Sequence, residues 1–210
     1  MSKVLFVKAS PRGIRSHSVA VANQFIDSYM KRDLDAQVNI HDLFKMELPP
    51  MDGQTLGAKY SIMHGHQATN EEQLSWMKVE GIIEDFMDAD KYVFAVPMWN
   101  FGIPYRLKHY LDVIIQPSHT FEYLPDKGYT GLVTGRPCYI SFASGGEYSP
   151  GTQGEDLDYC RNYIQLALSF IGITDIRQTV VEPTMQKGPE EARRRQEAAV
   201  AAARRIAEQF

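Results

Sequence analysis

The chain has 210 residues, of which 44% are hydrophobic and 23% are charged, and its formal net charge is -4 at pH 7. This size and composition predict a single globular domain over residues 1–210, with enough apolar residues for a substantial core. The acidic balance argues against nucleic acid as a partner, and no apolar run is long enough to cross a membrane. The apolar segment at residues 4–7 is too short for a signal peptide, so we expect a cytoplasmic protein.

The first predicted strand, at residues 4–7, leads into a hydroxyl-rich loop and then into a helix whose apolar residues recur from Val19 onward. The free N–H groups and the dipole of a helix N-terminus favour an anion, so this junction indicates a phosphate site. The alternative is that Ser16 or Ser18 only caps the helix. Neither a P-loop nor a Gly-x-Gly-x-x-Gly pattern is present. The residues placed to reach a phosphate are Ser10, Ser16, His17 and Ser18.

Residues 37–43 alternate as an edge strand does, and residues 44–69 then show no clear period. A stretch of that length without regular structure is usually functional, so we expect a lid or an interface arm. His64 and His66 lie two positions apart within it, but no third ligand is close, and we expect no metal site.

A helix opened by a capping box at Asn70 and Gln73 precedes an apolar strand at residues 91–96. Pro104 then begins another helix, where its fixed φ suits the first turn. Open α/β sheets bind ligands outside the carboxyl ends of their strands, so we expect the loop between this strand and this helix to bind a ligand. Gly102 is expected to let the backbone approach a flat molecule. The loop residues are Pro97, Met98, Trp99, Asn100, Phe101 and Gly102.

Residues 116–131 are rich in proline, glycine and aromatic side chains, which predicts an excursion or hairpin at the carboxyl edge of the sheet. Phe121 alternates with polar residues in this segment. Its ring either covers a flat ligand or packs against the excursion itself.

A further strand at residues 137–143 ends in Ser144, Gly145 and Gly146. A Gly-Gly turn at the end of a strand exposes consecutive N–H groups, which suit the electron-rich edge of a flat ring. The alternative is an ordinary glycine turn. Tyr148 follows the turn and either donates a proton, covers a substrate or only packs. The chain is completed by a helix from Asp156, a strand at 173–182 and a helix at 189–209.

This alternation of strands and helices predicts an α/β three-layer sandwich, with a five-stranded parallel sheet and helices on both faces. The flavodoxin-like strand order 2-1-3-4-5 makes the first, third and fourth strands neighbours, so the three candidate loops meet at one edge. A helix N-terminus, an aromatic loop and a Gly-Gly turn together suit a phosphorylated flat heterocycle. FMN has this size and polarity, and its ring carries the redox chemistry itself.

The segment at 97–104, with the serine loop before it and the Gly-Gly turn after it, resembles the FMN-dependent NADH:quinone oxidoreductases, also called azoreductases. The resemblance covers essentially the whole chain. It implies a flavodoxin-like fold, bound FMN and a homodimer with an active site at each end of the interface. It also implies two-electron reduction of quinones and aromatic azo compounds by NADH or NADPH.

Carried onto this sequence, the resemblance implies that Ser10 and residues 16–18 hold the phosphate. Residues 98–101 would flank the isoalloxazine ring, and residues 144–146 would meet its pyrimidine edge. Trp99 departs from the family pattern because many members have Tyr there, so a hydroxyl contact is lost.

One pocket shared by nicotinamide and quinone predicts ping-pong kinetics. The alternative function is a flavodoxin-like FMN electron carrier without NAD(P)H:quinone activity of its own. A phosphate-ester enzyme is a weaker alternative, because no Cys or Asp nucleophile lies in the serine loop.

Overall fold

The centre of the molecule is a five-stranded parallel sheet, described here from a computed structural model that covers all 210 residues. Its strand order is β2-β1-β3-β6-β7, so the predicted order 2-1-3-4-5 is confirmed, with β6 and β7 as its fourth and fifth strands. The five strands are β1 (Lys3–Lys8), β2 (Gln37–Asp42), β3 (Lys91–Pro97), β6 (Cys138–Ala143) and β7 (Ile176–Val181).

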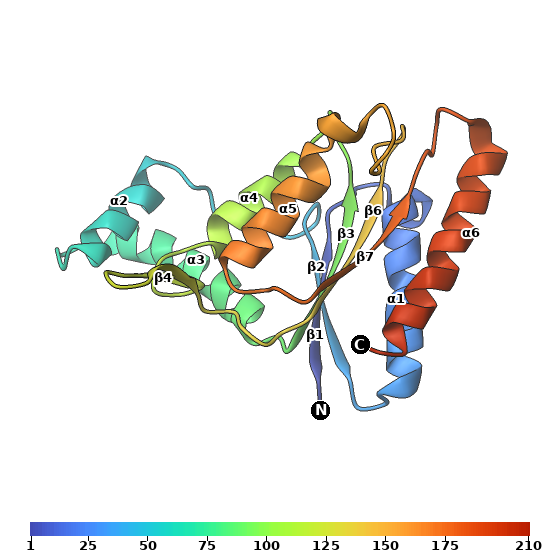
Figure 1. The fold of residues 1–210 in the computed structure, drawn as a ribbon. Helices are drawn as coiled ribbons and strands as arrows, with labels where there is room; N and C mark the ends of the chain where they lie inside the picture. Colours follow the sequence, from blue (N-terminus) through green and yellow to red (C-terminus); the bar gives the residue numbers. More distant parts are fainter.

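Helices cover both faces of this sheet, as the alternating pattern predicts (Figure 1). Two helices, α1 (His17–Arg32) and α6 (Gly188–Ala207), pack side by side on one face. The other face carries α3 (Asn70–Met87), α4 (Tyr105–Ile114) and α5 (Tyr159–Phe170). None of the six helices is both long and apolar enough to cross a membrane.

Two hydrophobic cores lie on the two faces of the sheet, because successive side chains of a strand point in opposite directions. In β1, Leu5 and Val7 belong to the core beneath α4 and α5, whereas Val4 and Phe6 belong to the core beneath α1 and α6. In the second core the ring of Phe25 stacks on Tyr139 with centroids 3.9 Å apart. Burial on both faces explains why the central strands read as unbroken apolar runs in the sequence.

The arm at residues 44–69 contains a helix, α2 (Gly53–Met63), which the sequence pattern did not predict. Asp52 caps it by accepting a hydrogen bond from the Thr55 N–H group at 3.0 Å. Only Thr55 and Ala58 of this helix are buried, so its apolar residues show no single inward face.

The helix α3 begins with a capping box one residue earlier than predicted. The box is formed by Thr69 and Glu72 rather than by Asn70 and Gln73. A shift of two residues occurs at α5, where Asp158 is the cap rather than the predicted Asp156. Asp156 belongs instead to a short 3-10 turn, Glu155–Leu157.

The predicted hairpin is present as β4 (Phe121–Leu124) and β5 (Gly128–Gly131), but it lies at the other end of the sheet from the one expected. It follows the end of α4, and it is tied to the end of α5 where Val133 N–H donates to Ile171 O at 2.8 Å. A Cβ on Gly131 would come within 2.2 Å of the backbone of Gly172, so the two chain segments touch here. The hairpin therefore belongs to the amino edge, where β6 and β7 begin.

Candidate functional site

The loops after β1, β3 and β6 leave the sheet side by side, because these strands are hydrogen-bonded neighbours. The pairing continues past the strand ends: Ala9 N–H donates to Ala95 O at 3.0 Å, and Met98 N–H donates to Ala143 O at 2.8 Å. The three predicted segments thus meet at the carboxyl edge of the sheet (Figure 1). This edge is where open parallel sheets bind ligands.

The first segment is a cluster of serine hydroxyl groups at the start of α1. Ser10, Ser16 and Ser18 are nearly fully buried. The Oγ atoms of Ser16 and Ser18 lie 3.2 Å apart, and Ser16 Oγ also accepts from Val19 N–H at 3.5 Å. The N–H groups of His17 and Ser18 have no acceptor within the chain. Ser16 therefore caps the helix, and the first turn still offers two unpaired donors to an anion.

His17 contributes to this segment through its backbone rather than through its ring. Its Nδ1 atom forms a hydrogen bond with Gln196 Oε1 of α6, at 2.5 Å. The imidazole is therefore used to fasten α1 to α6.

The second segment is a tight turn with an unusual backbone conformation. Trp99 and Gly102 exchange two backbone hydrogen bonds, at 2.9 and 3.0 Å, and the two residues between them have positive φ. These are Asn100, with φ 47°, and Phe101, with φ 69°. The left-handed region costs about 1 to 2 kcal/mol for each non-glycine residue. Strain of this kind is concentrated at functional sites.

The turn presents two donors that no protein group uses, the N–H groups of Asn100 and Phe101. Gly102 itself does not have positive φ, which falls on the two preceding residues. A Cβ on Gly102 would lie 3.9 Å from Trp99 O, which is an ordinary contact. Nothing within the chain itself therefore requires glycine at this position.

Trp99 belongs to an aromatic cluster that also includes Phe44 and Tyr105. Its ring centroid lies 5.7 Å from that of Phe44 and 6.3 Å from that of Tyr105. Neither contact was predicted from the sequence. Phe44 is the first residue of the long arm after β2, and an aromatic residue at that junction is the one signal that pointed here.

The third segment is the turn at Ser144, Gly145 and Gly146. The N–H groups of both glycines have no acceptor within the chain. The carbonyl groups, in contrast, are fixed: Ser144 O accepts from Thr184 N–H at 2.9 Å, and Gly145 O accepts from Met185 N–H at 3.1 Å. The turn is thus fixed through its carbonyl groups, while its N–H donors remain free for a ligand.

Two side chains, those of Gln186 and Tyr148, lie close to Gly146 and would have to shift to admit a larger residue. A Cβ there would lie 2.9 Å from Gln186 Nε2 and 3.1 Å from the ring of Tyr148. Tyr148 also reaches the second segment, where its ring meets Phe101 edge to face with centroids 6.2 Å apart. Tyr148 therefore connects the second and third segments.

Phe121 does not join the other predicted residues within this chain. Its ring packs against Phe170 of α5, with centroids 4.8 Å apart, and against Tyr129 of the same hairpin. The structure thus brings the serine loop, the 97–102 turn, the 144–146 turn and Tyr148 to one edge, and it leaves Phe121 at the other.

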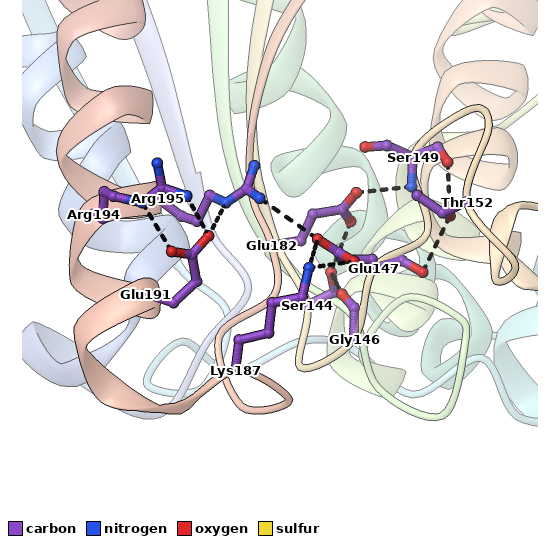
Figure 2. A network of polar contacts seen from close by, with 10 residues as sticks. All are labelled: Ser144, Gly146, Glu147, Ser149, Thr152, Glu182, Lys187, Glu191, Arg194 and Arg195. Atoms are coloured by element: carbon purple, nitrogen blue, oxygen red, sulfur yellow. Dashed lines mark hydrogen bonds and ion pairs between the residues drawn. The ribbon is translucent and has the colours of Figure 1, made fainter.

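Beneath the third segment lies a network of charged side chains that joins the loop to α6 (Figure 2). Glu147 pairs with Lys187 at 2.8 Å and with Arg195 at 3.5 Å. Arg194 and Arg195 also hold the pKa of Glu191 at about 2 through hydrogen bonds to its carboxylate. This network fixes the glycine turn to the start of the last helix.

Comparison with known proteins gives a family and several close relatives. A family model described as a flavodoxin-like fold matches residues 2–206. An FMN-dependent NADH:quinone oxidoreductase of Nitratidesulfovibrio vulgaris is 46% identical over 210 residues, which cover 100% of both chains. One of Desulfotalea psychrophila is 45% identical over 185 residues, which cover 88% of this chain and 87% of that protein.

Solved structures agree with these sequence relatives. The crystal structure of an azoreductase from Bacillus anthracis has a TM-score of 0.92 and 31% identity, with 100% of both chains covered. An FMN-dependent NADH-azoreductase from the same species, crystallised in complex with FMN, has a TM-score of 0.86 and 30% identity. That comparison covers 99% of this chain and 100% of the other.

Proposed function

The chain belongs to the flavodoxin-like family whose model spans residues 2–206, and from that premise we propose that it is an FMN-dependent NAD(P)H:quinone oxidoreductase and azoreductase. It transfers two electrons from NADH or NADPH to quinones and also reduces aromatic azo compounds. The observation that carries this conclusion is the meeting of three loops with unpaired N–H donors at the ends of β1, β3 and β6.

The residues present suit FMN in charge and shape. Buried hydroxyl groups and the two free N–H groups at the start of α1 suit a phosphate, because donors and the helix dipole favour negative charge. In this proposal His17 takes part through its N–H group. The residues assigned to the phosphate are Ser10, Ser16, His17 and Ser18.

The other two segments suit the flavin ring. Pro97 and Met98 lead into the turn, Trp99 and Phe101 offer aromatic faces, and the free N–H groups of the turn supply donors at the ring edge. The N–H groups of Gly145 and Gly146 would stabilise negative charge at the pyrimidine edge, with Ser144 and Gly102 shaping the two turns.

FMN, when bound, supplies the hydride-accepting and hydride-donating chemistry. This chain's residues orient the ring, exclude water from one face and provide a hydroxyl group at Tyr148 that can hold a proton beside the substrate. Nicotinamide and quinone would use the same open face in turn, which gives ping-pong kinetics. Parallel lines in initial-velocity plots support one shared site, whereas intersecting lines refute it.

The test of the proposed function is NADH and NADPH oxidation by FMN-loaded protein with a simple benzoquinone. The proposed enzyme should oxidise the nucleotide steadily with the quinone as acceptor. It should also do so when an aromatic azo dye is supplied in place of the quinone. A flavodoxin-like electron carrier, the second reading of the sequence, binds FMN but shows almost no turnover in this assay. That result would reject the enzymatic function and leave the FMN site standing.

We also propose that the protein is a cytoplasmic homodimer that acts as one domain over residues 1–210. The helices α2, α3 and α5 and the hairpin all expose large apolar side chains, which is typical of an interface. Residues of these elements that are more than half exposed include Tyr60, Met63, Leu74, Met77, Tyr123, Tyr129 and Leu166. Phe121 would then reach substrate only at the site of a partner subunit, since its own site lies at the opposite edge. NADH and NADPH, as intracellular nucleotides, support the location.

A further inference from the structure

The hydroxyl group of Ser144 faces two acceptors but has a single proton. Its Oγ atom lies 3.0 Å from Gly146 O and 3.0 Å from Glu182 Oε2. A serine hydroxyl donates one hydrogen bond at a time. The two contacts are both satisfied only if Glu182 itself carries a proton and donates it to Ser144 Oγ, which then donates to Gly146 O.

If Glu182 is ionised, Ser144 donates to Glu182 instead, and Gly146 O is left without that bond. The other carboxyl oxygen of Glu182, Oε1, accepts from Ser149 N–H at 2.7 Å in both cases. The same heavy-atom positions therefore serve a charged and a neutral Glu182, and only the Ser144 proton has to turn.

Glu182 lies between solvent and the candidate FMN site. Its residue is 8% exposed. On one side it lines a cavity of about 400 Å³ between β7 and α6, together with Glu147 and Arg195 (Figure 2). On the other side it lines a much smaller cavity together with Met98 and Ser144. A proton from solvent can thus reach this carboxyl group without passing the flavin-binding turns.

The charges around Glu182 leave room for either protonation state. The nearest cation is Arg161, whose Nη2 atom is 3.9 Å from Oε2, and this guanidinium group is already paired with the buried Asp158. Glu147 and Arg195 line the same cavity but pair with each other. Direct hydrogen bonds to Glu182 come only from two neutral donors, and its one ion pair is with a guanidinium group that Asp158 also contacts, so two buried carboxyl groups share a single buried cation.

We propose that Glu182 takes up one proton when FMN at this site is reduced and releases it when FMN is reoxidised, while the Ser144 hydroxyl turns between Glu182 and Gly146 O. The inference rests on the proposed function. A hydride from NAD(P)H brings two electrons and one proton, which adds one net negative charge to the flavin. One solvent proton on Glu182 balances that charge. When a quinone removes the hydride, the Glu182 proton returns to solvent and the quinone takes its second proton there.

The experiment measures the two-electron midpoint potential of bound FMN across about pH 5 to 9 in the wild type, Glu182→Gln and Glu147→Gln. A glutamine at 182 keeps both contacts, because its carbonyl accepts from Ser149 and its amide donates to Ser144, and so it imitates the protonated acid. Glu147→Gln is the matched control, since it removes a charge from the same loop and cavity.

For each proton taken up with the two electrons, a rise of one pH unit changes the equilibrium constant for reduction tenfold. This change lowers the midpoint potential by about 30 mV. Over part of this pH range the wild type and Glu147→Gln should show one proton more than Glu182→Gln, and thus a slope steeper by about 30 mV per pH unit. The Glu182→Gln and wild-type potentials should converge toward acid pH. Equal slopes in all three proteins would overturn the inference, while the bound, active FMN would leave the proposed function intact.

If Glu182→Gln does not bind FMN, protonation of Glu182 can be tested in the wild-type protein by infrared difference spectroscopy. The reduced-minus-oxidised spectrum should contain the carbonyl stretching band of a newly protonated carboxyl group, and its absence refutes the inference. Failure of the wild-type protein to bind FMN would refute the proposed function itself. This outcome differs from equal potential slopes and from a missing carboxyl band, both of which are measured with FMN bound.

Discussion

Replacement of Ser16 by alanine separates the two roles of the serine at the start of α1. Ser16 Oγ accepts from Val19 N–H at 3.5 Å, a long bond, so the loss of the cap should cost the protein without ligand only about 0.5 to 1 kcal/mol of unfolding free energy. The same hydroxyl would donate to the FMN phosphate. A hydrogen bond to a charged group contributes about 1.5 to 3 kcal/mol, so the FMN dissociation constant should rise about ten- to a hundredfold.

The assay is fluorescence titration of the protein freed of flavin, with FMN and with riboflavin, which lacks the phosphate. Ser16→Ala should weaken FMN binding and leave riboflavin binding nearly unchanged. Ser28→Ala, farther along the same helix, is the control and should keep the wild-type FMN affinity. An equal loss for both flavins would show that the change acts through folding of the loop. An unchanged FMN affinity would place the phosphate elsewhere.

Three further substitutions test other parts of the account. Gly146→Ala should weaken FMN and riboflavin alike, because the added Cβ meets Gln186 at 2.9 Å; unchanged riboflavin affinity would contradict the assigned ring edge. Met77→Glu should shift sedimentation from dimer to monomer, and a persistent dimer would exclude this surface as the interface. Burial lowers the pKa of His41 below its usual 6.5, so its neutral form stabilises the fold. That stability is present above about pH 6.5 and is lost on acidification, by at most about 1.4 kcal/mol per pH unit. His41→Asn should reduce this loss in chemical unfolding, and an identical pH dependence would contradict it.

The sheet could be predicted from sequence because burial on both faces leaves a strong signal. The apolar runs around Phe6, Phe94 and Ile140 have no polar alternation, and helical periods separate them. The helix α2 was missed for the opposite reason. It buries only Thr55 and Ala58 within this chain, and a helix without an inward face gives no period to detect.

The meeting of the three candidate segments could be predicted from the sequence, but their local backbone geometry could not. The junctions of strand, loop and helix located all three segments, since those depend on topology. The left-handed pair at Asn100 and Phe101 was not predicted, because asparagine adopts positive φ only in a minority of cases and phenylalanine does so rarely. Contacts between distant segments, such as Phe44 against Trp99 or Ser144 against Glu182, have no local signature and require the folded chain.

The central claim is that one FMN molecule is held jointly by the ends of β1, β3 and β6. Amide NMR spectra of the labelled protein with and without FMN test this most directly, because the N–H groups assigned to binding are individually observable. We expect the signals of His17 and Ser18, of Asn100 and Phe101, and of Gly145 and Gly146 all to move together at one equivalent of FMN. Shifts confined to one of these segments, or centred on another part of the sheet, would contradict it.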